Sequence, residues 1–143
     1  IDNKSKDPLF KRLVSNMGVV TYPDGIVLDN QTYFLKHGCR PRSCPEKGVV
    51  WINKKKKIFI GLIVHKYFEN QEVDKSISWF DLPINYLFFS SSINSFEDIP
   101  NVYWKHFREL EIDNLQYGYG NPNKVRFIGE GLKITDVTKE FYK

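Results

Sequence analysis

The chain has 143 residues, 41% of them hydrophobic, which suits a single domain with one core. Its net charge of +4 falls short of the strong basic bias of dedicated nucleic-acid-binding proteins, and no apolar run is long enough to span a membrane. Aromatic residues make up 15% of the chain, and together with many Ile and Val residues they favour β-sheet.

The first element in chain order is a predicted helix over residues 7–18. Asp7 suits the capping position, Pro8 the first helical position and Gly18 the end. The chain begins with Ile1 rather than Met, as expected of a mature or otherwise trimmed form.

The middle of the chain has the alternating pattern of an antiparallel meander. The strands predicted there occupy 25–36, divided by the turn pair Asp29-Asn30, then 48–52, 58–67 and 75–80. In the strand that begins at Ile58, alternation places Phe59 on one face and Ile58 and Ile60 on the other, a pattern typical of core.

The sequence pattern of the last third of the chain differs from that of the meander. Residues 83–93 fit either a helix or a strand, and 117–123 form a loop rich in turn formers. The spacing of Tyr103, Phe107 and Leu110 predicts a helix near 100–112. The remaining residues predict a strand over 124–134 that is interrupted by glycines and a short helix over 135–143.

Both cysteines lie in one stretch, HGCRPRSCPEKGVVW, at residues 37–51. A zinc site built on His37, Cys39 and Cys44 lacks the fourth ligand and the paired spacing usual for structural zinc. A redox pair would have two residues between its cysteines, and here there are four, namely Arg40, Pro41, Arg42 and Ser43. A small disulfide loop fits best, although the other two interpretations stay open. Its chain-entropy contribution would be only about 2 kcal/mol, so its main effect would be local shape.

A loop stiffened by Pro41 and a disulfide, with Arg40 and Arg42 pointing outward, has the properties of a binding element. The simpler alternative is a loop that only closes a hairpin and leaves its arginines in solvent. A lasting disulfide implies an oxidising compartment, so we expect a periplasmic or secreted bacterial protein.

Other function classes receive little support from the sequence. The lysine run 54–57 is what an exposed turn between strands often carries, so nucleic-acid binding is not expected. No phosphate-binding glycine loop, nucleophile elbow or zinc-protease motif occurs, so we expect neither an enzyme nor a cofactor.

The cysteine stretch and the strands around it resemble the Ivy family, periplasmic inhibitors of vertebrate c-type lysozyme. The residues that carry the resemblance are Tyr33, Leu35, His37, Gly38, Cys39, Arg40, Pro41, Arg42, Cys44 and the pair Gly61-Leu62. The resemblance implies a single α+β domain over 1–143, with a central antiparallel sheet flanked by helices. It also implies a Cys39–Cys44 disulfide and a possible homodimer.

In that family the loop enters the lysozyme cleft, and its central histidine reaches the two catalytic carboxylates. Arg42 occupies the histidine position here. The resemblance therefore implies an inhibitory loop of Cys39, Arg40, Pro41, Arg42, Ser43 and Cys44, with His37 supporting its base. The expected partner is lysozyme or a related glycan hydrolase, and a less basic one than vertebrate lysozyme because this chain is itself cationic. The alternative is a non-inhibitory envelope domain that binds a protein or a glycan, such as an immunity-type protein against a cell-wall-degrading toxin.

Overall fold

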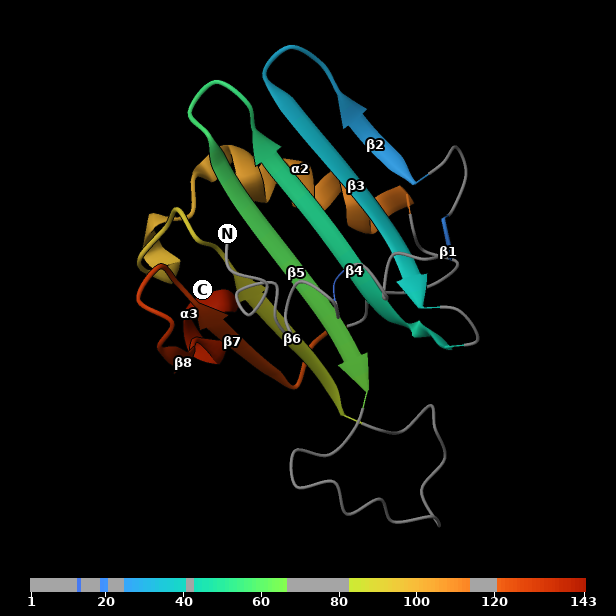
Figure 1. Ribbon diagram of the computed structural model, residues 1–143. Coiled ribbons are helices and arrows are strands. Elements are labelled where there is room, and N and C mark those ends of the chain that lie inside the picture. The colour runs from blue at the N-terminus through green and yellow to red at the C-terminus, as the bar shows by residue number, and fades with distance from the viewer. Residues whose placement is uncertain (1–12, 14–18, 21–24, 41–42, 67–82, 114–120) are drawn as a thin grey trace, which may run out of the picture.

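The computed structural model describes residues 13, 19–20, 25–40, 43–66, 83–113 and 121–143. One eight-stranded sheet dominates these residues, accompanied by the helices α2 and α3 and the 3-10 turn η2 (Figure 1). The elements are β1 (Val19–Val20), β2 (Ile26–Asp29), β3 (Tyr33–Arg40), β4 (Ser43–Asn53), β5 (Ile58–Lys66), β6 (Ile84–Phe89), η2 (Phe96–Asp98), α2 (Asn101–Asp113), β7 (Lys124–Ile128), β8 (Ile134–Asp136) and α3 (Thr138–Phe141).

The strands follow the order β1-β3-β4-β5-β6-β7-β8, and β2 also pairs with β3. Every pairing is antiparallel except that of β6 with β7, which is parallel. Parallel neighbours need a crossover connection, and α2 lies in the segment that makes it. The expected antiparallel sheet is therefore found with one exception.

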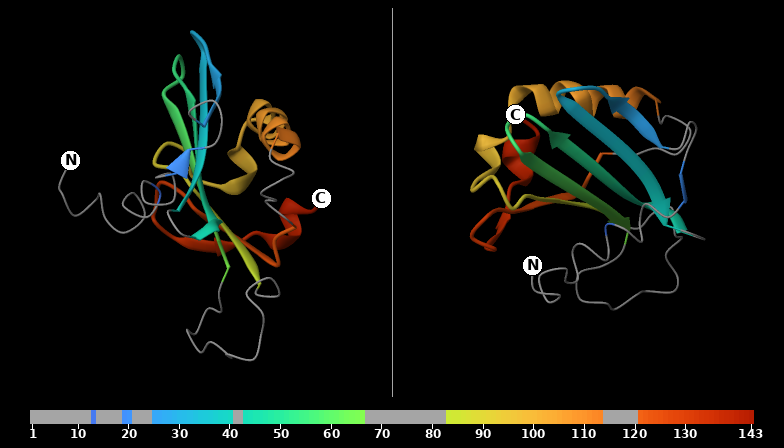
Figure 2. Two further views of the ribbon diagram at one scale, coloured as in Figure 1. Left: turned by 90° about the vertical axis from the view of Figure 1, so that its right-hand side faces the viewer. Right: turned by 45° about the horizontal axis from the view of Figure 1, so that its top comes forward.

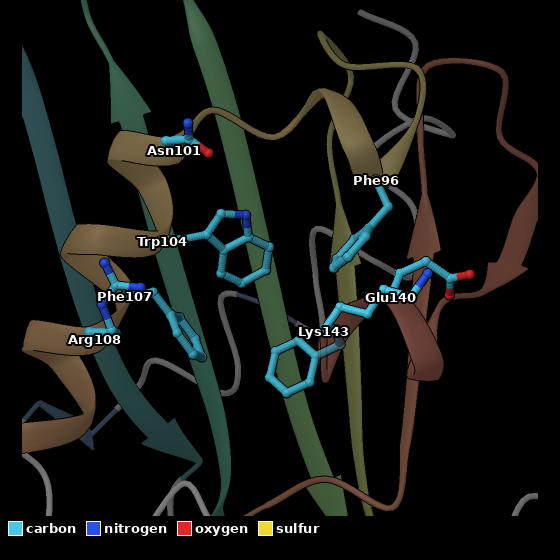
Figure 3. A pocket seen from close by; sticks show the side chains of 8 residues that line it. Phe96, Asn101, Trp104, Phe107, Arg108, Glu140 and Lys143 are labelled. Carbon is cyan, nitrogen blue, oxygen red and sulfur yellow. The ribbon is translucent and has the colours of Figure 1, made fainter.

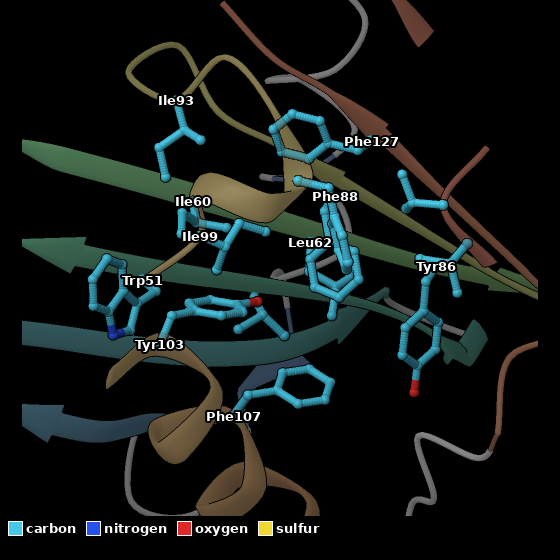
Figure 4. Packing of buried hydrophobic residues seen from close by; sticks show 14 of the residues in the cluster. Trp51, Ile60, Leu62, Tyr86, Phe88, Ile93, Ile99, Tyr103, Phe107 and Phe127 are labelled. Atoms are coloured by element: carbon cyan, nitrogen blue, oxygen red, sulfur yellow. The ribbon is translucent and has the colours of Figure 1, made fainter. Parts of the chain in front are cut away.

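The helices α2 and α3 and the turn η2 all lie on one face of the sheet (Figure 2). Alternation along the strands sends every second side chain towards them. The result is a core rich in aromatic rings, in which Trp51 of β4 and Phe88 of β6 pack against Tyr103 of α2 (Figure 4). The predicted helical face of Tyr103, Phe107 and Leu110 is buried in this core.

The opposite face of the sheet carries a second, smaller cluster. Leu13, from the segment predicted to be helical, is buried there against Ile63, Phe89 and Ile128. Phe59 is partly buried against the same cluster, whereas Ile60 belongs to the helical face. The alternation predicted for this strand is confirmed, and both of its faces are covered.

Most of the described elements lie where the local sequence pattern predicted them. The two hairpins and the helix near 100–112 are found, with β4 beginning five residues earlier than expected, at Ser43. The ambiguous segment 83–93 contains strand β6. The segment 124–134 divides at Gly129 into two strands, because Glu130 turns away and its N–H donates to the carbonyl of Ile93 (2.9 Å).

The described part of the chain forms a single α+β domain in which the sheet predominates. The strand predicted at 75–80 and all of the helix predicted at 7–18 except Leu13, which is helical, lie outside the described residues.

Candidate functional site

The cysteine stretch forms the end of the β3–β4 hairpin, at the opposite end of the sheet from the β4–β5 turn (Figure 1). Arg40 pairs with Ser43, so only Pro41 and Arg42 stand between the two strands. Pro41 and Arg42, and the side chains of Arg40, Ser43 and Cys44, lie outside the described residues. In the sequence, Arg42 therefore falls between the last residue of β3 and the first residue of β4.

The register of the hairpin shifts close to this end. Cys39 pairs with Lys47, whereas the next residue, Arg40, pairs with Ser43. The β4 side therefore contains three extra residues, 44–46, in an irregularity of the bulge type. Such shifts change the direction of the strand, and this one interrupts the regular pairing of β3 with β4 between Cys39 and Arg40.

Cys39 is buried at 3% exposure on the helical face of the sheet. No cysteine among the described residues is a free thiol. Because the side chain of Cys44 is outside the described residues, the Cys39–Cys44 pairing stays a prediction.

His37 lies two residues before Cys39 on the same face of β3, and it is buried. Its backbone N–H donates to the carbonyl of Gly25 at 2.8 Å, next to the start of β2. His37 therefore lies in β3 near the base of the loop, on the same face of the strand as Cys39.

Two charged residues of the hairpin are also buried, and sequence reasoning missed both. Glu46 is 5% exposed and Lys47 is 3% exposed. Charged side chains are almost never this buried without partners, so the base of the hairpin is polar yet closed to solvent. The signal was present in the sequence, because Lys47 shares the inward alternation of Val49 and Trp51.

The lysine run 54–57 forms the exposed turn between β4 and β5, as expected. The Nζ atom of Lys54 lies 2.8 Å from an Asp29 carboxylate oxygen and donates to the carbonyl of Asn30 at 2.7 Å. This lysine therefore ties two neighbouring hairpin turns together.

The three histidines of the chain lie in three different elements, His37 in β3, His65 in β5 and His106 in α2. The Nδ1 atom of His106 accepts a hydrogen bond from the Trp51 indole. Across the described ranges no group of three or more His, Cys, Asp or Glu side chains is placed to hold a metal ion.

The loop predicted at 117–123 is described only from residue 121 onward. There, Asn123 exchanges two hydrogen bonds with the backbone of Ile84, at 2.8 Å and 2.9 Å, and so fixes the start of β7 beside β6. This part of the loop has a structural role.

Comparison with models of protein families, with curated proteins and with solved structures gave no match for this chain. None of the helices in the described ranges has the length and apolar character required to cross a membrane.

Proposed function

We propose that this protein inhibits a lysozyme-type peptidoglycan glycosidase by inserting loop 39–44 into the active-site cleft. The observation that carries the proposal is the β3–β4 hairpin, in which Arg40 pairs with Ser43, Arg42 falls between the paired strands in sequence, and the base is buried. The resemblance of residues 33–62 to the Ivy family supports the same assignment.

The hairpin is suited to a rigid insertion. Both of its strands are also paired on their outer sides, β3 with β1 and β2, and β4 with β5. Cys39 and His37 are buried near the base of the loop. A loop anchored on strands held in this way would lose little conformational freedom on binding, and this would lower the entropic cost of association.

Arg42 supplies the chemistry expected of a plug. Glycosidases of this type need one protonated carboxylic acid and one ionised carboxylate. A guanidinium pairs bidentately with carboxylates, and its positive charge lowers the pKa of a neighbouring acid. Arg42 would therefore fill the cleft and also remove the proton that the enzyme donates to its leaving group.

The net charge of +4 narrows the choice of partner. Two cationic proteins repel each other at long range, so a strongly basic lysozyme would associate slowly. A less basic glycan hydrolase, in the periplasm or outside the cell, is the partner that this charge favours. Assembly of the protein as a homodimer remains part of the same proposal.

The variant Arg42→Ala tests the plug directly. We expect it to bind the target hydrolase about tenfold or more weakly, because a charge-assisted contact is lost, while its circular dichroism is unchanged. Lys55→Ala is the matched control, since it removes one cation from the exposed turn at the other end of the sheet. Equal binding by Arg42→Ala and wild type would refute the insertion mechanism.

A further inference from the structure

A cavity of about 520 Å³ lies between α2 and α3 on the helical face of the sheet (Figure 3). This volume is within the range of about 300–1,000 Å³ that is usual for small-molecule sites. The cavity is on the β6–β8 side of the sheet, whereas loop 39–44 belongs to the β3–β4 hairpin, so the two are separate. Its lining residues are Phe96, Asn101, Trp104, Phe107, Arg108, Glu140, Phe141 and Lys143.

Aromatic rings from three elements form the apolar part of the cavity. The Trp104 indole is only partly buried, and the rings of Phe96, Phe107 and Phe141 stand edge-on around it, at centroid distances of 5.5, 5.8 and 6.0 Å. Phe107 and Phe141 also contact Phe88 of β6, which holds the rings against the sheet. The indole is therefore a fixed platform that is bordered by phenyl rings.

Four polar or charged side chains line the cavity around the Trp104 indole. Within the described part of the protein, the side chains of Asn101, Arg108, Glu140 and Lys143 make no hydrogen bond or ion pair. Together they offer amide and cationic donors as well as amide and carboxylate acceptors. Among the lining side chains, Arg108 and Lys143 are cations and Glu140 is a carboxylate.

We propose that this cavity binds a sugar residue that carries a carboxylate, as part of a glycan chain. The apolar face of a pyranose ring can pack on the Trp104 indole through dispersion contacts. Its hydroxyl groups each donate and accept hydrogen bonds, which matches the mixed donors and acceptors of Asn101 and Glu140. The guanidinium of Arg108 offers a bidentate partner for the sugar carboxylate.

The charged lining residues disfavour two other classes of ligand that bind in aromatic pockets, namely quaternary ammonium groups and purely apolar molecules. A quaternary ammonium group would face the repulsion of Arg108 and Lys143. A purely apolar ligand would gain nothing from the polar lining side chains. The inference does not depend on inhibition by loop 39–44, and it holds or fails by itself.

Titration of the ¹⁵N-labelled protein, followed by NMR, tests the site with two matched sugars. N-acetylmuramic acid and N-acetylglucosamine differ only in the lactic acid ether, which bears the carboxylate. We expect the acid to shift the indole N–H signal of Trp104 in a saturable way and the neutral sugar to bind several-fold more weakly. Trp104→Phe assigns the signal among the three tryptophans of the chain.

Two exposed residues of α2 provide the matched variants. Arg108→Gln should weaken binding of the acid about tenfold, because a charge-assisted contact is lost. Lys105→Gln, which removes a cation of the same helix that does not line the cavity, should leave it unchanged. No shift at Trp104, equal binding of both sugars, or equal loss in both variants would overturn the proposal.

A disaccharide of the two sugars distinguishes a glycan from a free sugar acid. Binding at least as tight as that of the single acid would support a site for a glycan chain. Binding of the free monosaccharide alone would contradict it.

Discussion

The indole Nε1 of Trp51 donates a hydrogen bond of 3.0 Å to Nδ1 of His106, and both side chains are buried. The bond joins the C-terminal part of β4 to α2, across 55 positions of sequence. The ring of Tyr33 lies edge-on to the same imidazole at 4.9 Å. Because Nδ1 accepts this bond, His106 is neutral in the folded protein.

The stability of the fold should therefore depend on pH through His106. Burial lowers the pKa of His106 below its ordinary value of 6.5, and Lys105 lowers it further, against the opposing effect of Glu109. The unfolded chain then binds a proton more readily than the folded chain, so the free energy of unfolding rises with pH. The contribution is complete above about pH 6.5 and is lost as the pH falls through the lowered pKa.

Urea unfolding between pH 5 and pH 7.5 measures this dependence, and His106→Asn provides the comparison. Asparagine keeps an acceptor for the Trp51 indole but does not titrate in this range. We expect a smaller slope of stability against pH in the variant than in the wild type. Because His37 and His65 are present in both proteins, identical slopes would show that His106 is not responsible.

Position 61 in β5 has no space for a side chain, because the ring of Phe89 in β6 lies against Gly61. A Cβ atom at this position would lie 2.4 Å from Cζ of Phe89, whose ring covers the glycine. Gly61→Ala should lower the free energy of unfolding by about 1–3 kcal/mol, since the Phe89 ring must move. Gly131→Ala is the control, because its nearest neighbour would be 3.9 Å away. Equal effects of the two substitutions in urea unfolding would contradict this account.

Ser90 ties the end of β6 to β5 on the inner side of a turn. Its hydroxyl donates to the carbonyl of Phe59 at 2.5 Å and accepts from the backbone N–H of Ser92 at 3.1 Å. Ser90 is buried, so Ser90→Ala should cost about 1–3 kcal/mol by leaving these groups unsatisfied. Ser95→Ala removes only an exposed contact with Asp98 and should cost less than about 1 kcal/mol. A reversed order in thermal or urea unfolding would disprove this assignment.

The elements that the sequence predicted correctly are those determined by nearby residues. The turn at Asp29-Asn30 and the lysine turn each specify a hairpin, and the spacing of Tyr103, Phe107 and Leu110 specifies α2. In the candidate site, the position of the loop at a hairpin end followed from the same local pattern. These features need no knowledge of distant contacts.

Two features that the sequence did not predict depend on residues that are distant in the chain. The parallel register of β6 with β7 places Tyr86 beside Val125, and the crossover that makes it leaves no local mark. The contact of Trp104 with Phe141 likewise joins two helices that follow different strands. Burial of Lys47 was readable from alternation, but the charge of the side chain argues against an inward position.

The central claim is that loop 39–44 blocks a peptidoglycan hydrolase, and an inhibition panel tests it most directly. The panel contains a vertebrate c-type lysozyme, a goose-type lysozyme and a bacterial lytic transglycosylase, each assayed on a cell-wall suspension. The oxidised protein, the reduced protein and Arg42→Ala are compared at equal concentrations. The account predicts inhibition of at least one enzyme that is lost on reduction and weakened about tenfold or more in Arg42→Ala. No inhibition of any enzyme, or inhibition that survives both changes, would contradict it.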